Sequence, residues 1–186
     1  MKKISDFLLR FSTHWVALAA LLIFFTFSVL TLPGETKRTE MYGQGIGSPA
    51  TSLFFSGDQL LTIADTYGEV GRAAYIKACW TFDLAFPIIY TVFFLTSISF
   101  LLKKVVSEDS KLRQLNLIPF LGMIFDLAEN SATTSVMSAY PGQNPVGLML
   151  AQVFTPIKWL FVGLSMILLI LLLLAWLVKA VTFIRK

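Results

Sequence analysis

Cysteine and histidine are nearly absent from this sequence of 186 residues, which contains one of each, Cys79 and His14. A single cysteine excludes an intramolecular disulfide, a Cys-x-x-Cys redox pair and a cage of thiolates around a metal. A single histidine excludes zinc or haem sites that need several histidines. The sequence also lacks a Gly-x-Ser-x-Gly motif, so a serine hydrolase of that type is not indicated.

Charged residues are scarce as well, at 14% of the chain against 56% hydrophobic residues and a mean hydropathy of +0.74. Soluble domains carry about 25% charged residues, so this chain cannot cover its surface with polar groups in water. The length leaves no room for a soluble catalytic domain beside a membrane domain. We therefore expect one membrane domain over residues 1–186, with the lipid bilayer as its partner and with neither a cofactor nor a nucleic-acid partner.

Four apolar runs are long enough to cross about 30 Å of hydrocarbon as helices, which takes about 20 residues each. They cover approximately residues 11–32, 80–102, 115–137 and 159–178. The first run is longer than the core of a secretory signal and is not followed by a small-x-small cleavage site, so we expect it to be retained. The expected fold class is all-α, a polytopic membrane protein with a bundle of four transmembrane helices.

A loop of about residues 33–79 separates the first two runs. Up to Phe55 it is rich in glycine, serine, proline and threonine, which predicts irregular chain. Ser56 is then suited to cap a short helix, and Tyr67-Gly68 predicts a break before a second helix that leads into the second run. The loop is therefore expected to contain one or two short helices.

Basic residues are distributed unevenly over this topology, because ten of the fifteen fall at the termini or between the second and third runs. These ten are Lys2, Lys3, Arg10, Lys103, Lys104, Lys111, Arg113, Lys179, Arg185 and Lys186. The positive-inside rule assigns this side to the cytoplasm. Both termini are therefore expected to be cytoplasmic, and the loop of residues 33–79 to lie outside.

Three carboxylates fall inside the expected spans: Asp83, Asp126 and Glu129. An aspartate at the centre of a membrane helix costs about 2.5–3.5 kcal/mol, so these side chains must face inward or be neutralised. Asp126, Glu129 and Asn130 share one face of the third run at the spacing of a helix. We expect one of the two neighbouring carboxylates to be protonated, or both to be held by a cation.

The second run supplies another polar face, on which Asp83 and Tyr90 lie with Pro87 between them. The proline predicts a kink and a free backbone carbonyl near Asp83. The rise of a helix places Asp83 and Glu129 in the same outer half of the membrane. Basic partners within reach are Lys158, at the outer start of the fourth run, and Arg72 or Lys77, ahead of the second.

These residues leave three functions open. The first is a buried acidic site that binds a cation, a proton or the headgroup of a lipid or small molecule, for sensing or transport; its ligands would be Asp83, Tyr90, Asp126, Glu129, Asn130, Lys158 and Arg72. A metal, if bound, would use the three carboxylates, although their spacing is not diagnostic.

The second function is structural, with the polar face meeting a second copy of the chain or another membrane protein. The third is an enzyme acting on a lipid headgroup of the outer leaflet, with basic residues holding a phosphate while a carboxylate moves a proton. Against all three stands the simpler interpretation that the polar residues only join helices to one another.

Four short motifs are also similar to those of a group of uncharacterised bacterial membrane proteins with four spans. The motifs are Tyr67-Gly68-x-x-Gly71-Arg72, Asp83-x-x-Phe86-Pro87-x-x-Tyr90, Phe125-Asp126-x-x-Glu129-Asn130 and Phe154-Thr155-x-x-Lys158-Trp159. The resemblance covers roughly residues 56–160. It implies the four-span architecture, a bacterial cytoplasmic membrane and a set of candidate positions, but no chemistry.

Overall fold

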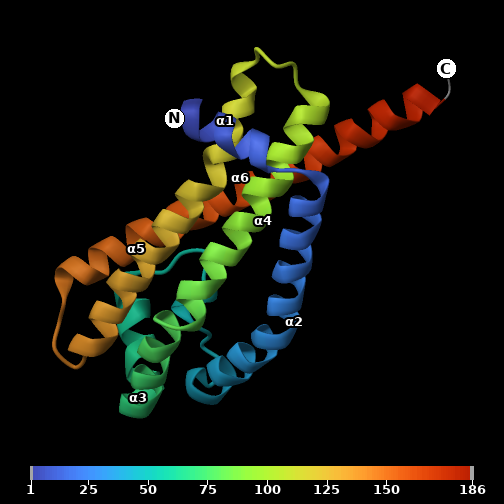
Figure 1. The fold of residues 1–186 in the computed structure, drawn as a ribbon. Helices are drawn as coiled ribbons and strands as arrows, with labels where there is room; N and C mark the ends of the chain where they lie inside the picture. The colour runs from blue at the N-terminus through green and yellow to red at the C-terminus, as the bar shows by residue number, and fades with distance from the viewer. Residues whose placement is uncertain (1, 185–186) are drawn as a thin grey trace.

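The computed structural model describes residues 2–184, and in this range the chain forms helices and no strand (Figure 1). The α-helices are α1 (Lys2–Phe11), α2 (His14–Gly43), α3 (Gly57–Cys79), α4 (Phe82–Val105), α5 (Ile118–Ala139) and α6 (Pro145–Ile184). Two short 3₁₀ helices, η1 (Pro49–Thr51) and η2 (Lys111–Leu117), lie in the connections. The all-α class is confirmed. Arg185 and Lys186, expected in a basic tail, lie outside the described residues.

Three helical segments of the described chain are long and apolar enough to cross a membrane: His14–Gly43, Gly57–Val105 and Pro145–Thr182. The second of them joins α3 to α4. Helix α5, which corresponds to the expected third span, does not meet this standard. Its carboxylates Asp126 and Glu129 and its amide Asn130 make it too polar.

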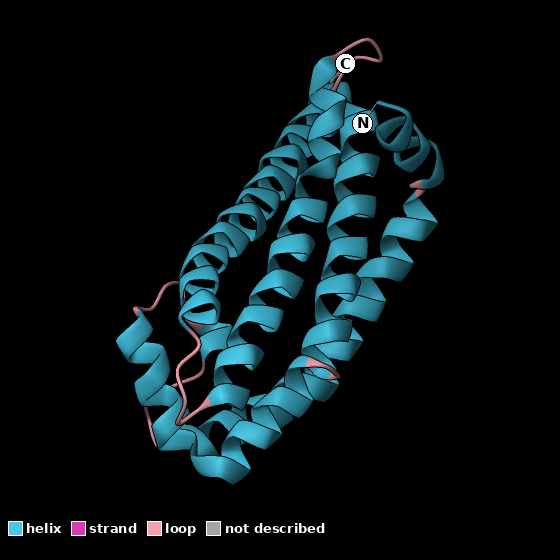
Figure 2. Cartoon of the chain, turned by 90° about the vertical axis from the view of Figure 1, so that its left-hand side faces the viewer, coloured by secondary structure: helices cyan, strands magenta, loops and turns pink. Residues whose placement is uncertain are grey.

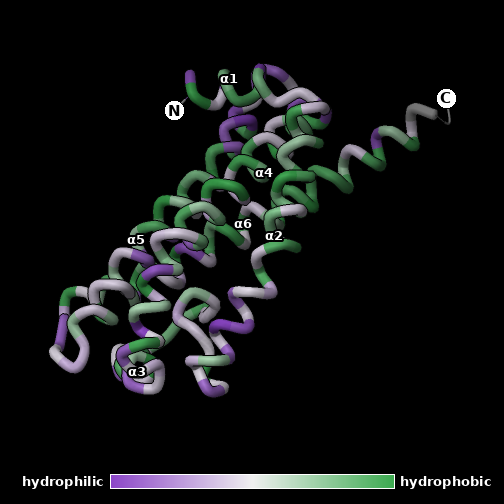
Figure 3. Tube along the Cα trace, turned by 60° about the horizontal axis from the view of Figure 1, so that its bottom comes forward, coloured by the Kyte–Doolittle hydropathy of each residue, from purple (hydrophilic) through white to green (hydrophobic). Residues whose placement is uncertain are grey.

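The helices run between two ends of an elongated bundle, and both described ends of the chain lie at the same one (Figures 1 and 2). Helix α1 crosses that end beside the connection from α4 to α5, whereas α3 lies at the opposite end. Hydrophilic residues gather at both ends and hydrophobic residues fill the length between them (Figure 3). This banding suits a protein whose middle lies in hydrocarbon.

Helix α2, which contains the first apolar run, differs from the expected boundaries at both ends. It begins at His14 because the Thr13 side chain accepts a hydrogen bond from the Val16 backbone N–H, at 3.3 Å, and caps α2. It continues through Pro33 and ends at Gly43, followed by Gln44 in the left-handed region at φ 46°. The expectation of irregular chain from residue 33 to 55 was therefore wrong as far as Gly43.

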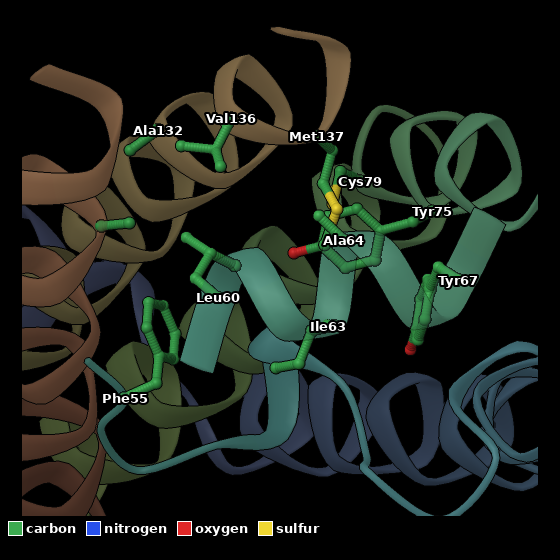
Figure 4. Close-up of a cluster of buried hydrophobic side chains, with 11 residues drawn as sticks. Phe55, Leu60, Ile63, Ala64, Tyr67, Tyr75, Cys79, Ala132, Val136 and Met137 are labelled. Atoms are coloured by element: carbon green, nitrogen blue, oxygen red, sulfur yellow. The ribbon is translucent and has the colours of Figure 1, made fainter. Parts of the chain in front are cut away.

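Helix α3 begins as expected, with Ser56 and Gln59 forming a reciprocal capping box. It is kinked at Gly68, where φ is 60° and ψ is 179°, a conformation that favours glycine. The helix packs on α5, and the two share a buried cluster (Figure 4) that includes Leu60, Ala64, Tyr75, Val136 and Met137. These contacts make α3 an integral part of the bundle.

Helix α6 begins at Pro145, well before the expected start of the fourth span at residue 159. Asn144 caps it, since its side-chain oxygen accepts from the Gly147 N–H at 2.9 Å. Its 40 residues make it about 60 Å long at 1.5 Å per residue. The first half packs along α5, while the last turns project away from the bundle (Figure 1). Lys158 consequently lies inside the helix and not at its start.

Candidate functional site

Lys158 is the centre of a buried ionic cluster between α5 and α6. Its side chain is 3% exposed, and its ammonium forms an ion pair with Oε2 of Glu129, which is 1% exposed. Oδ1 of Asp126 lies 3.8 Å from the same ammonium. One cation therefore faces two carboxylates in a place that water barely reaches, and buried charges persist only when paired in this way.

Two hydroxyl groups donate hydrogen bonds to the same two carboxylates. Thr155, one turn before Lys158 on α6, donates to Oε1 of Glu129 at 2.9 Å. Tyr90 of α4 donates to Oδ2 of Asp126 at 2.9 Å. Tyr90 is thus part of the cluster and not merely a core aromatic residue. Three helices meet in this network, so the polar face of α5 finds its partners within the chain.

The proline kink of α4 also connects to this face. Pro87 has no N–H, so the carbonyl of Asp83, four residues earlier, has no partner within α4. Nδ2 of Asn130 donates to that carbonyl at 2.9 Å. The expected free carbonyl near Asp83 is confirmed, and it is satisfied from α5.

The connection between α2 and α3 closes over the cluster. The Lys158 ammonium donates to the backbone oxygen of Ala50 at 3.2 Å and lies 5.0 Å from the centre of the Trp159 ring. The Trp159 indole N–H donates to the backbone oxygen of Ser52 at 2.7 Å. Residues 50–52 are therefore fastened to α6 by two hydrogen bonds. These contacts and that of Thr155 were not predicted from the sequence.

A cavity of about 370 Å³ adjoins the cluster, between α2, α4 and α6. Asp83, Tyr90, Asp126 and Lys158 supply its polar wall. The rest of its lining is mostly apolar and aromatic, and includes Phe24, Phe82, Phe86, Phe94, Trp159 and Met166. Since α2 packs mainly on α4, the cavity lies along the side of the bundle where α2 and α6 stand apart.

A second cavity of about 230 Å³ lies next to the first, at the end of the bundle that holds α3. Its walls carry more polar groups, among them Glu35, Arg38, Glu40 and Ser48. Both cavities are lined by Asp83, together with Leu32, Ala50, Thr51 and Phe82. Asp83 has no ion-pair partner among the described residues. Its carboxylate is therefore available where the polar and the apolar cavity meet.

Two expectations for the site are not met. Arg72 is not brought to the cluster: it donates to the backbone oxygen of Ala64 at 2.9 Å, before the Gly68 kink, and lies 4.9 Å from the centre of the Tyr140 ring. The three carboxylates do not form a metal site either, because no three His, Cys, Asp or Glu side chains within residues 2–184 converge as metal ligands. The ammonium of Lys158 stands where a cation shared by Asp126 and Glu129 would have to be.

Comparison with known proteins adds nothing to this geometry, since no family model, curated protein or solved structure matches the chain.

Proposed function

We propose that this chain is a multipass membrane protein that binds the headgroup of a lipid or other amphipathic molecule in the 370 Å³ cavity, as a sensor or carrier. The proposal rests on one observation: the cavity has a polar wall on one side and a mostly aromatic wall on the other. An amphipathic molecule has the matching division, because its head can bond Asp83 and Asp126 while its apolar part contacts the rings.

The charges favour a head that is cationic or rich in hydrogen-bond donors. Asp83, Asp126 and Glu129 count three negative charges against one positive charge on Lys158, a formal sum of −2. An amine would offset this charge and would also be attracted to the faces of the surrounding aromatic rings. A bare metal ion fits less well, because oxygen ligands must close around it at about 2.0–2.6 Å.

The proposal includes a four-span topology in which α5 is the additional crossing, with both termini in the cytoplasm of a bacterial cell. The described residues at the terminal end support this orientation, since Lys103 and Lys104 lie in the last turn of α4 there and Lys111 and Arg113 follow in η2. Helix α5 can cross despite its carboxylates because Lys158, Thr155 and Tyr90 satisfy them.

The structural alternative has less support, because the polar face that would meet a partner is already bonded within the chain. Asp126, Glu129 and Asn130 all have partners on α4 or α6. The enzyme alternative has no specific observation in its favour among residues 2–184. We therefore favour binding.

Quenching of Trp159 fluorescence tests the proposal, because this indole lines the cavity. A variant with Trp15, Trp80 and Trp176 changed to phenylalanine would be titrated in nonionic micelles with brominated phosphatidylethanolamine, phosphatidylcholine and phosphatidylglycerol. We expect quenching to saturate at the lowest concentration with phosphatidylethanolamine, whose head carries a primary amine. Equal curves for all three lipids would contradict the proposal.

Asp83→Asn in this background should weaken the response to phosphatidylethanolamine. Glu69→Gln is the matched control, because Glu69 is an exposed carboxylate on α3 that lines neither cavity. An unchanged curve for Asp83→Asn, or the same loss for Glu69→Gln, would show that the carboxylate of Asp83 does not select the head.

A further inference from the structure

A separate cluster of charged side chains lies at the other end of the bundle, where α1 meets the connection from α4 to α5. It lines a cavity of about 340 Å³ whose residues are Asp6, Leu9, Arg10, Lys103, Glu108 and Arg113. The three basic residues come from three different elements: α1, α4 and η2. The fold therefore brings together cations that lie far apart in the sequence.

Two of these cations are held in place by backbone contacts. The Lys103 ammonium donates to the backbone oxygen of Ser12, just after α1, at 2.6 Å. Arg113 donates from one terminal nitrogen to the backbone oxygen of Val106 at 3.0 Å. Nε of Arg113 is buried and has no hydrogen-bond partner within the described residues. A buried N–H without a partner is costly, so it calls for an acceptor.

The acids in the same cavity do not supply that acceptor. Neither Asp6 nor Glu108 lies within 4.0 Å of a basic nitrogen in the part of the chain that the structure describes. Arg10 likewise makes no hydrogen bond or ion pair there. Three cations and two carboxylates thus line one cavity, a formal sum of +1, and no cation there is paired directly with a carboxylate within the described residues. A group with anionic oxygens would match the unpaired cations.

The helix that carries Arg10 is also suited to the level of the lipid headgroups. Helix α1 crosses the end of the bundle, and its apolar side chains Ile4, Phe7 and Phe11 are 60%, 65% and 56% exposed. An amphipathic helix of this kind lies in the plane of the membrane interface with its apolar face in the acyl region. Arg10, on the same helix, is then level with the phosphates.

We propose that Arg10, Lys103 and Arg113 form a binding site for a phosphate group, carried by an anionic phospholipid of the leaflet that faces this end or by a free phosphate compound. Guanidinium groups bind phosphate oxygens through paired, charge-assisted hydrogen bonds, and Nε of Arg113 is one of the donors in that geometry. The site is independent of the 370 Å³ cavity, with which it shares no residue.

The test is the thermal unfolding of the full chain in nonionic micelles, with phosphatidylglycerol, phosphatidylcholine or inorganic phosphate added. We expect phosphatidylglycerol to raise the midpoint of unfolding more than phosphatidylcholine does. Arg10→Gln should weaken the apparent affinity about tenfold, because it removes a charge-assisted contact. Arg10 is exposed and makes no hydrogen bond or ion pair with the other described residues, so we expect this variant to fold.

Lys3→Gln is the matched control, because it removes one positive charge from the same helix without touching the cavity. Stabilisation by inorganic phosphate as well, lost in Arg10→Gln, would support a free phosphate compound as the ligand, and stabilisation by phosphatidylglycerol alone would support the lipid. Equal loss in Lys3→Gln would overturn the site in favour of general surface charge. No stabilisation of the native protein by either phosphate source would overturn it as well.

Discussion

Replacing Asn130 by leucine removes the side chain that satisfies the broken backbone of α4. In the native protein its amide donates to the Asp83 carbonyl at 2.9 Å, and Asn130 is 1% exposed. Leucine has the same number and branching of side-chain heavy atoms as asparagine, although its methyl groups are bulkier, and it has no donor. The carbonyl that Pro87 leaves without a helical partner would then be buried without any partner.

We expect this change to lower the free energy of unfolding by about 1–2 kcal/mol. The lower figure follows from interhelical hydrogen bonds in membranes, which average about 0.6 kcal/mol and reach about 1.7. The upper figure follows from the cost of a buried acceptor left unsatisfied, about 1–3 kcal/mol. Unfolding in mixed micelles of nonionic and ionic detergent, followed by far-UV circular dichroism, measures the difference.

A second change distinguishes this mechanism from ordinary loss of packing. Pro87→Ala restores a backbone N–H four residues after Asp83, so it can supply the missing bond from within α4. In the Asn130→Leu background it should recover about 1 kcal/mol more than it contributes in the native background. Equal effects of Pro87→Ala in the two backgrounds would refute the reasoning, because the two residues would then act independently.

Three further predictions use the same unfolding assay. Lys158→Met should cost about 3–5 kcal/mol by leaving the buried carboxylate of Glu129 and the partly buried carboxylate of Asp126 without their cation. The double variant with Glu129→Gln should recover part of the loss, and a double variant worse than the single one would refute the pairing. Asn116→Leu should cost about 2–3 kcal/mol and detach α1, because Asn116 accepts from the Ser5 hydroxyl and donates to the Ser5 backbone oxygen and to Ser99. Limited proteolysis would report the detachment, and unchanged cleavage near the N-terminus would contradict this prediction. Ser56→Ala should cost about 1 kcal/mol through loss of the capping box, and an unaltered midpoint would speak against a structural role for the cap.

The middle of the fold could be predicted closely from sequence. The runs expected at 80–102 and 115–137 correspond to α4 (Phe82–Val105) and α5 (Ile118–Ala139). Both runs are more apolar than the connections that bound them, even though α5 carries Asp126, Glu129 and Asn130, so hydropathy marks their ends within a few residues. The capping box at Ser56 and the break at Gly68 were predictable for a similar reason, because each depends on local chemistry.

The ends of the long helices were not predictable from hydropathy, because a helix does not stop where its apolar run stops. Glu35 and Arg38 form an ion pair one turn apart and favour continued helix beyond Pro33. Helix α6 begins at Pro145 because its early residues pack on α5, a tertiary contact that periodicity does not reveal. The separate helix α1 was missed because its ten residues are too short for a span.

The candidate site was predictable in part. The helical face of Asp126, Glu129 and Asn130 follows from spacing alone, and burial of two carboxylates required either a nearby cation or protonation of one of them. Lys158, Arg72 and Lys77 were all candidate partners in the sequence, and only the packing of α6 on α5 selects Lys158. Contacts from irregular chain, such as the backbone oxygen of Ala50, depend on the path of the loop and have no local signal.

The position of Asp83 explains why three carboxylates can be tolerated in one membrane domain. Lys158 offsets the charge of Glu129 and lies close to Asp126. Of these three carboxylates, Asp83 is the one that has no ion-pair partner among the described residues. An unpaired charge in hydrocarbon would be costly, but Asp83 also lines the polar cavity that holds Glu35, Arg38 and Glu40. Water in that cavity can solvate one side of the carboxylate while the other side faces the apolar cavity. The binding that we propose depends on this arrangement, because a cationic head would reach Asp83 from the apolar cavity while the polar cavity solvates the carboxylate when no head is bound.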